Sequence, residues 1–288
     1  MIWLLLSISC SVLIFIVFKL FKTYSVDNLQ AILVNYFVAF GIGLALSNGE
    51  QHPLNLVEQP WFSSVLILGL LFISLFRLMA WVSQNYGMAT VSVAVKMAVI
   101  VPVSFGVIYF GESLGALKLT GILLALLAVY MTTYQPRKMK SSAASFWFPI
   151  ILFLGSGFLD AFLKYNEAEL VPAADQSWFA SSIFGMAALF GLVFVAYQRF
   201  AQKQKFELKS VLGGLALGIP NYGSIYFLLR SLSMRGLESS SIFALNNVGI
   251  VFLSALLGYF FFKEKLSSLN LAGIGLAIVS IVLIALAL

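Results

Sequence analysis

Charged side chains inside otherwise apolar stretches are the residues of this sequence that could do chemistry. Arg77 lies about two-thirds of the way through the apolar stretch 62–84, and Lys96 lies about one-third into the stretch 88–110. If both stretches cross a bilayer as consecutive helices, the two cations reach a similar depth, and neither stretch contains an acidic side chain. Because charge at such depth is costly and usually functional, the pair predicts an anion site. Arg77 would offer a carboxylate or phosphate a planar fork, and Lys96 a point charge.

Polar neighbours extend both cations along helix faces. Arg77, Trp81 and Gln84 follow the spacing i, i+4, i+7, while Ser92 precedes Lys96 by one turn. We predict that all five bind substrate. The alternative is that one or both cations snorkel toward lipid headgroups on their long stems. A neutral Lys96 that exchanges a proton is a further alternative.

Asp160 and Lys164 form a second charged pair, at i and i+4 in the stretch 147–165. An intramembrane pair of this kind can relay a proton or an ion. It can equally be a self-neutralised structural pair near the membrane surface, which is the favoured interpretation because buried pairs are commonly scaffolding.

Amide and aromatic side chains mark the last stretches. The Pro220-Asn221 step is expected to interrupt the helix over 209–231 and to free a backbone carbonyl. The alternatives are an ordinary kink with aromatic packing, and amides that fasten helices together. The predicted substrate-binding residues of this region are Asn221, Tyr222, Tyr226, Asn246 and Asn247.

Amino-acid composition indicates the class of protein that must position these residues. The chain of 288 residues is 61% hydrophobic and 10% charged, with a mean hydropathy of +1.01, whereas soluble domains carry about 25% charged residues. These values predict an all-α integral membrane protein, because lipid cannot satisfy unpaired backbone groups. One cysteine and one histidine exclude an intrachain disulfide and make a metal site improbable, so we expect no metal and no cofactor.

Ten stretches are long enough to cross a bilayer as helices. The expected transmembrane helices cover 2–21, 29–47, 62–84, 88–110, 116–134, 147–165, 177–198, 209–231, 239–261 and 268–288.

An internal repeat divides these ten helices into two groups of five. Aligning Glu112 with Glu264 makes eight of fourteen positions identical over 112–125 and 264–277, including Gly121 and Gly273. We interpret these four residues as a structural motif of caps and hairpins. The expected units are a first repeat over 1–134, a basic loop over 135–145 and a second repeat over 146–288. Because five is odd, the repeats must be inverted, as in many secondary transporters.

The same hairpin carries a family resemblance. The segments Tyr109-Phe110-Gly111-Glu112-Ser113-Leu114 and Phe261-Phe262-Lys263-Glu264-Lys265-Leu266, each followed by a helix containing the paired glycine, resemble the EamA family of the drug/metabolite transporter superfamily. The resemblance covers essentially the whole chain. It implies export of amino acids or other metabolites through a central cavity lined by helices three, four, eight and nine. Lys96 departs from the family pattern, in which the fourth helix is usually uncharged.

Charge distribution predicts orientation, because positive loops favour the cytoplasm. Eleven basic residues fall on one side of the ten-helix arrangement and four on the other. This places both termini outside the cytoplasm of a cell inner membrane, whereas many members of the family have both termini inside. The eleven are Lys19, Lys22, Arg137, Lys138, Lys140, Arg199, Lys203, Lys205, Lys209, Lys263 and Lys265.

These patterns together predict a secondary transporter that moves a small organic anion or zwitterion by alternating access. The sequence has no phosphate-binding loop and no His-Glu-x-x-His motif, so we expect neither ATP hydrolysis nor an enzyme. Efflux of hydrophobic cations through Asp160 is the alternative, and a non-transporting membrane scaffold comes after it. The expected partners are the substrate and the lipid bilayer, without nucleic acid, and a monomer is our working expectation.

Overall fold

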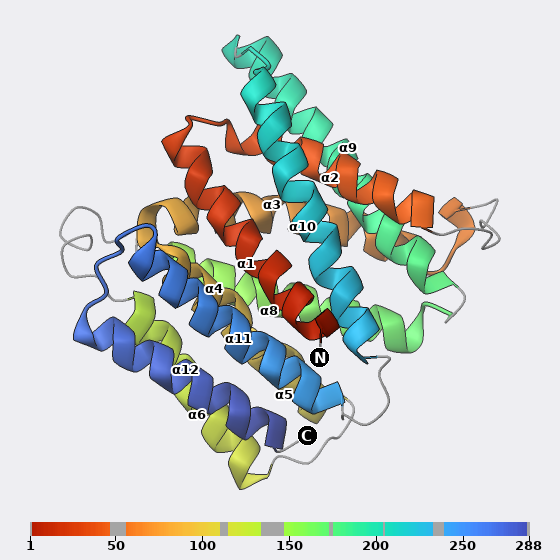
Figure 1. Cartoon of the computed structure of the whole chain (residues 1–288). Helices are drawn as coiled ribbons and strands as arrows, with labels where there is room; N and C mark the ends of the chain where they lie inside the picture. The colour runs from red at the N-terminus through yellow and green to blue at the C-terminus, as the bar shows by residue number, and fades with distance from the viewer. Residues whose placement is uncertain are drawn as a thin grey trace.

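The protein is described by a computed structural model that covers residues 2–46, 56–109, 115–133, 147–172, 175–203, 205–232 and 239–286. Within these residues the secondary structure is entirely helical, without a strand (Figure 1). Five of these helices, α1, α2, α3, α9 and α10, are long and apolar enough to cross a membrane. The described chain is therefore compatible with a helical membrane protein.

Helices lie at all ten expected places, with two of them, α4 and α5, at the fourth. They are α1 (Ile2–Thr23), α2 (Asn28–Leu46), α3 (Phe62–Tyr86), α4 (Met88–Met97), α5 (Ile100–Tyr109), α6 (Ala116–Thr133), α8 (Trp147–Glu169), α9 (Gln176–Gln202), α10 (Leu208–Leu232), α11 (Ser239–Phe260) and α12 (Ser268–Leu286), with the short helix η1 (Leu56–Glu58) before α3. Polar residues fix several starts. Asp27 Oδ1 accepts the Gln30 N–H at 2.8 Å and so caps α2.

The fourth expected helix is not continuous, because it breaks at Ala98-Val99 into α4 and α5. Pro102 supplies the cause: it has no N–H to donate to the carbonyl of Ala98. That carbonyl instead accepts the Val101 N–H at 3.0 Å. Gly157 of α8 lies against this break, where an added Cβ would come within 2.9 Å of the Ala98 carbonyl oxygen. The break is thus a packed feature of the fold, and it follows Lys96 by two residues.

The expected interruption at Pro220 is wrong, because α10 runs through it without a break. The residue after it, Asn221, is buried and donates to Asn35 Oδ1 of α2 at 3.1 Å. Two glycines let the same helices approach closely: a Cβ on Gly214 or Gly218 would collide with Val34 or Val38. Tight packing against α2 therefore holds α10 continuous despite its proline.

The helices pack into two neighbouring groups (Figure 1). One contains α1, α2, α9 and α10, with α2 packed against both α9 and α10. The other contains α6, α11 and α12, and α6 runs along α12. Helices α4 and α8 pack against each other, and α4 also contacts α11. Lys96 and Asp160 belong to the facing pair α4 and α8.

Candidate functional site

Lys96 of α4 and Asp160 of α8 carry opposite charges on two helices that pack together. Lys96 is half-buried at the last turn of α4, directly before the break. Gly157, which lies against the break, precedes Asp160 by three residues and so lies on nearly the same side of α8. The helix break after α4 and the two opposite charges therefore lie close to one another, between α4 and α8.

Asp160 is exposed on the side of α8 opposite a strip of exposed apolar side chains. This strip includes Ile151, Leu154 and Phe158. Asp160 comes two and a half turns after Ile151, which puts it on the opposite side of the helix. Its neighbours on that side, Phe153 and Ser156, are buried, yet Asp160 itself is exposed. An accessible carboxylate on an inward side is what a solute-binding site requires.

Other predicted site residues on α4, α8 and α11 have mixed placements. Ser92 is buried and donates to the Ala89 carbonyl of its own helix at 3.0 Å. Asn246 is buried, and its Oδ1 has no hydrogen-bond partner among the described residues. Asn247 is half-buried beside it. The side chain of Lys164 lies outside the described part, so its expected pairing with Asp160 stays a prediction.

Arg77 lies in different surroundings from Lys96. It extends the exposed strip of α3 formed by Leu66, Ile67, Leu70 and Ser74, at spacings of three and four residues. Together with Trp81 and Gln84 it lines a groove of about 360 Å³, whose described lining does not include Lys96. The predicted face of α3 thus lines one groove, but Arg77 is not brought to the Lys96–Asp160 pair.

Trp81 and Gln84 make contacts of their own. Trp81 packs on Phe148 of α8, with ring centroids 4.3 Å apart. The Gln84 amide donates to the Phe18 carbonyl of α1 at 3.1 Å and to Asn28 Oδ1 at 2.8 Å. Both side chains therefore fasten α3 to its neighbours while they line the groove.

The aromatic residues of α10 form a local cluster. Tyr222 and Tyr226 stack with ring centroids 6.1 Å apart, and Arg230 donates from Nε to the Tyr226 hydroxyl at 3.2 Å. Tyr222 also lies near Gly43 of α2. Tyr222, Tyr226 and Arg230 lie on the same side of α10 as the exposed residues Leu215 and Ile219. No described contact brings these aromatic residues to Lys96 or Asp160.

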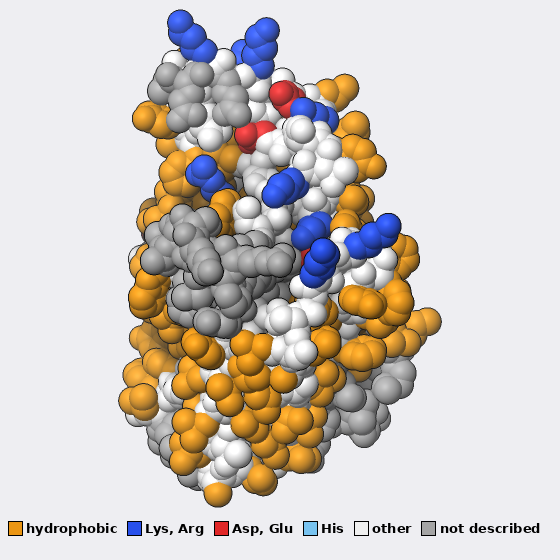
Figure 2. Space-filling view, turned by 90° about the vertical axis from the view of Figure 1, so that its left-hand side faces the viewer, with side chains coloured by type: hydrophobic (Ala, Val, Ile, Leu, Met, Phe, Trp, Pro, Cys, Tyr) orange, Lys and Arg blue, Asp and Glu red, His pale blue; other side chains and the backbone are white. Residues whose placement is uncertain are grey.

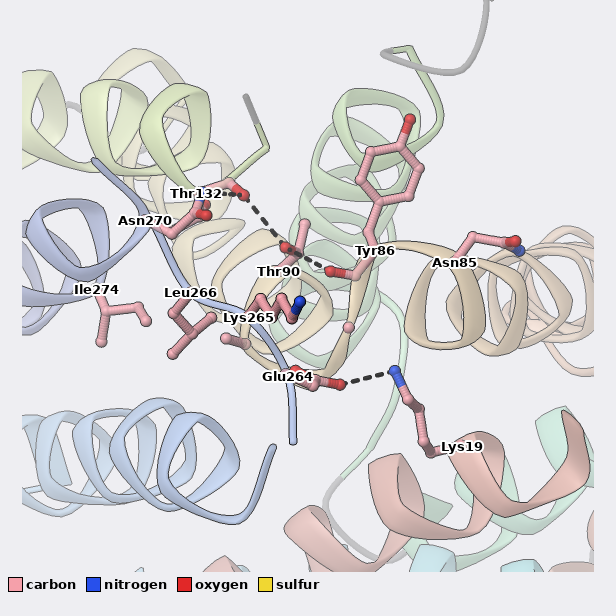
Figure 3. A pocket seen from close by; sticks show the side chains of 12 residues that line it. Lys19, Asn85, Tyr86, Thr90, Thr132, Glu264, Lys265, Leu266, Asn270 and Ile274 are labelled. Carbon is pink, nitrogen blue, oxygen red and sulfur yellow. Dashed lines mark hydrogen bonds and ion pairs between the residues drawn. The ribbon is translucent and has the colours of Figure 1, made fainter. Parts of the chain in front are cut away.

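A second pocket, of about 260 Å³, surrounds the carboxylate of Glu264 (Figure 3). The two Glu264 oxygens lie 3.0 and 3.1 Å from the N–H of Met88, the first residue of α4. Glu264 Oε1 also pairs with Lys19 Nζ of α1 at 2.7 Å. Gly87, at φ 99°, leaves room for the carboxylate, since an added Cβ would lie 2.6 Å from Oε2. Glu264 is therefore a cap for a helix far away in the sequence, which fits the structural role expected of it.

The opposite wall of this pocket is polar. Thr90 Oγ1 lies 3.2 Å from both the Tyr86 and the Thr132 carbonyls, and Asn270 donates to the Thr132 carbonyl at 3.2 Å (Figure 3). Asn270 also exchanges hydrogen bonds with Ser267, which starts α12 in the manner of a capping box. Lys19 was predicted only as a topology signal. Its spacing within α1 gave no sign of a partner 245 residues away. Glu112, the repeat partner of Glu264, lies outside the described residues.

Basic side chains gather at one end of the molecule, which Figure 2 views directly. The exposed lysines at helix ends and connections are Lys22 at the end of α1, Lys203, Lys205 and Lys209 around the α9–α10 connection, and Lys263 and Lys265 between α11 and α12. Apolar side chains occupy the rim and the lower part of the same view. Both chain ends lie away from this basic end (Figure 1).

Comparison with known proteins supplies relatives of the chain. No family model matches it. A Haemophilus influenzae protein described as an uncharacterized protein is 26% identical over 286 residues, which cover 94% of this chain and 93% of that one. A solved crystal structure has a similar fold, with a TM-score of 0.59 and 15% identity over 99% of this chain and 98% of its own. At this identity the likeness concerns the fold alone, and the resemblance to the EamA family stays a prediction.

Proposed function

We propose that this protein is a secondary transporter of the EamA type that moves a small zwitterion, such as an amino acid, or a related organic anion. The observation that carries the proposal is the accessible Asp160 on the inward side of α8, attracted to Lys96 at the break of the fourth helix. Broken helices with free backbone groups form the substrate sites of many transporters. An embedded charge pair beside such a break is a functional site by default.

The two charges favour a zwitterion. Lys96 can bind a carboxylate, and Asp160 can bind an ammonium group. A zwitterion would exchange the Lys96–Asp160 attraction for one contact with each partner, so neither charge would be left without an opposite charge. A bare cation would leave Lys96 unpaired, which is costly away from water. Asn246 lies on α11, which contacts α4, and its unpartnered Oδ1 could accept a further hydrogen bond.

Two inverted halves, 1–134 and 146–288, would supply the moving parts. In the repeat, α2 corresponds to α9 and α3 corresponds to α10. A symmetric pair of halves should therefore pack α2 against α10 and also α9 against α3, and both contacts are present. Gly121 and Gly273 support the same symmetry. An added Cβ on Gly121 would lie 2.6 Å from Ile284, and one on Gly273 would lie 2.9 Å from Thr132. The repeat alignment that pairs the two glycines also pairs Thr132 with Ile284.

The basic end would face the cytoplasm, with both termini on the other side of the inner membrane. In this orientation Lys19 and Glu264 join the two halves at the cytoplasmic end. Their ion pair would close that end, and rocking of the halves would have to break it.

The proposal is tested by ligand-dependent thermal unfolding of the full-length protein in mild detergent. The panel contains amino acids, dicarboxylates, sugar phosphates, nucleotide sugars and lipophilic cations, each tested on the native chain, Lys96→Ala, Asp160→Asn and the exposed control Lys209→Gln. A ligand that binds only the folded state stabilises it by about 2.7 kcal/mol at one hundred times its Kd. We expect a zwitterion to raise the unfolding temperature by about 5 °C or more, since about 2–4 °C corresponds to 1 kcal/mol in a chain of this size.

Both site variants should lose this shift, and Lys209→Gln should keep it. Uptake of the same compound into proteoliposomes should fall at least tenfold in either site variant, about 1.4 kcal/mol. Stabilisation by lipophilic cations alone, lost in Asp160→Asn and kept in Lys96→Ala, would replace the proposal with cation efflux. An identical response of the native chain and both site variants would show that the charge pair is structural.

A further inference from the structure

The groove beside Arg77 has the features of a site for a phosphate group. Its lining combines two cations, Lys22 and Arg77, with the amides of Asn28, Gln84 and Gln198. Within the part of the chain that the structure describes, neither Lys22 nor Arg77 makes an ion pair or a hydrogen bond. The acidic residue of the groove is Asp27, whose Oδ1 caps α2. Two cations and one carboxylate leave the groove with a net positive charge, and Arg77 forms no ion pair among the described residues.

Gln198 supplies a second, independent sign of a missing ligand. It lies in the groove near the end of α9, and its Oε1 is buried without a hydrogen-bond partner among the described residues. Buried amide oxygens normally find a partner. A half-turn of the same amide would present its N–H₂ group to an anion in the groove. Gln84 is already fixed by its hydrogen bonds to α1 and to Asn28, so one wall of the groove is preorganised.

The position of Arg77 indicates what kind of molecule carries the phosphate. Arg77 comes about two and a half turns before the end of α3, on a strip that is otherwise exposed and largely apolar: Leu66, Ile67 and Leu70. A guanidinium on a membrane-facing strip is costly unless an anion or water meets it. Lys22 is exposed in the last turn of α1, and anionic headgroups attract basic residues near a membrane surface. The groove thus joins headgroup depth to an apolar track that acyl chains could follow.

We propose that this groove binds a phosphate group, held by the fork of Arg77, the ammonium of Lys22 and the Gln198 amide. An anionic phospholipid headgroup is the source that the adjoining apolar strip favours, and a free phosphate would satisfy the same donors. The assignment goes beyond transport and does not depend on it. In this proposal Arg77, Trp81 and Gln84 bind a phosphate group, whereas the proposed transport substrate binds between Lys96 and Asp160.

Native mass spectrometry of the full-length protein tests the site by counting bound lipids. Phosphatidylglycerol and phosphatidylcholine are compared on the native chain, Arg77→Gln and the matched control Lys209→Gln, which removes an exposed lysine of the same basic end. We expect Arg77→Gln to reduce phosphatidylglycerol binding at least fivefold and Lys209→Gln to change it less than twofold. Phosphatidylcholine binding should be the same in all three.

A second arm separates the two sources of phosphate. Inorganic phosphate at millimolar concentration is added to the lipid-free protein while its unfolding temperature is followed. A rise that Arg77→Gln abolishes would assign the site to phosphate from either source, and no rise alongside selective phosphatidylglycerol binding would assign it to the lipid. Should Arg77→Gln not fold, Lys22→Gln carries the same expectation. Equal phosphatidylglycerol binding by the native chain and the variant, with no phosphate effect, would overturn the proposal.

Discussion

At the scale of single residues, two ion pairs among the described residues differ in burial. The Lys19 and Glu264 side chains are 20% and 9% exposed, whereas those of Lys209 and Glu207 are 45% and 46% exposed. Breaking a buried pair leaves a desolvated charge and costs about 3–5 kcal/mol, while an exposed pair contributes about 1 kcal/mol or less. A glutamate–lysine ion pair is therefore expected to contribute more stability between α1 and Glu264 than at the start of α10.

Glu264→Gln should consequently lower the unfolding temperature by more than 5 °C in detergent, because Lys19 loses its counter-ion and Met88 keeps one neutral acceptor. The matched change Glu207→Gln should lower it by less than 2 °C. Thermal unfolding monitored by tryptophan fluorescence measures both. Equal shifts in the two variants would contradict the structural weight given to Glu264.

Residue roles were only partly predictable from the sequence. Local spacing predicted that Arg77, Trp81 and Gln84 share one face of a helix, and all three line one groove. The attraction between Lys96 and Asp160 was missed, since it joins helices 64 residues apart and the nearer Lys164 offered a simpler partner. Contacts of this kind depend on how helices rotate in the bundle, which no local pattern encodes.

At the scale of helices, apolar length predicted the described helices well, because lipid allows few other structures. The prolines were less predictable. Pro220 lies inside a continuous α10, while Pro102, which carried no signal of its own, separates α4 from α5. The difference comes from packing: α2 supports α10 around Pro220, and Gly157 accommodates the break near Pro102. A proline removes one backbone hydrogen bond of a helix, and the packing of neighbouring helices determines whether the helix breaks there.

Pro102→Ala should restore the missing N–H and favour one continuous fourth helix. Alanine is about 3 kcal/mol more favourable than proline inside a helix, so the unfolding temperature should stay the same or rise. Transport of the identified substrate should fall at least fivefold, because Lys96 would lose the opened backbone beside it. Unchanged transport in proteoliposomes would show that the break has no part in function.

At the scale of the whole molecule, the proposed orientation in the membrane can be tested by labelling single introduced cysteines. Cys10 is the single cysteine of the chain, so Cys10→Ser gives a clean background. In that background Lys209→Cys lies at the basic end, and Val57→Cys lies in η1, where Val57 is 72% exposed. An impermeant maleimide added to intact cells should label Val57→Cys at once. It should label Lys209→Cys only after the membrane is permeabilised, and the reverse pattern would invert the topology.

The cap on α4 also has a consequence for biosynthesis. Met88 receives its carboxylate partner from a residue 176 positions later in the chain. Lys96 likewise precedes Asp160 in the chain, with α5, α6 and the connection after α6 between them. A growing chain therefore passes α4 into the bilayer before either partner has been made. The first half therefore cannot complete these contacts until the second half has been synthesised, and a fragment that ends between the halves would lack the cap of α4.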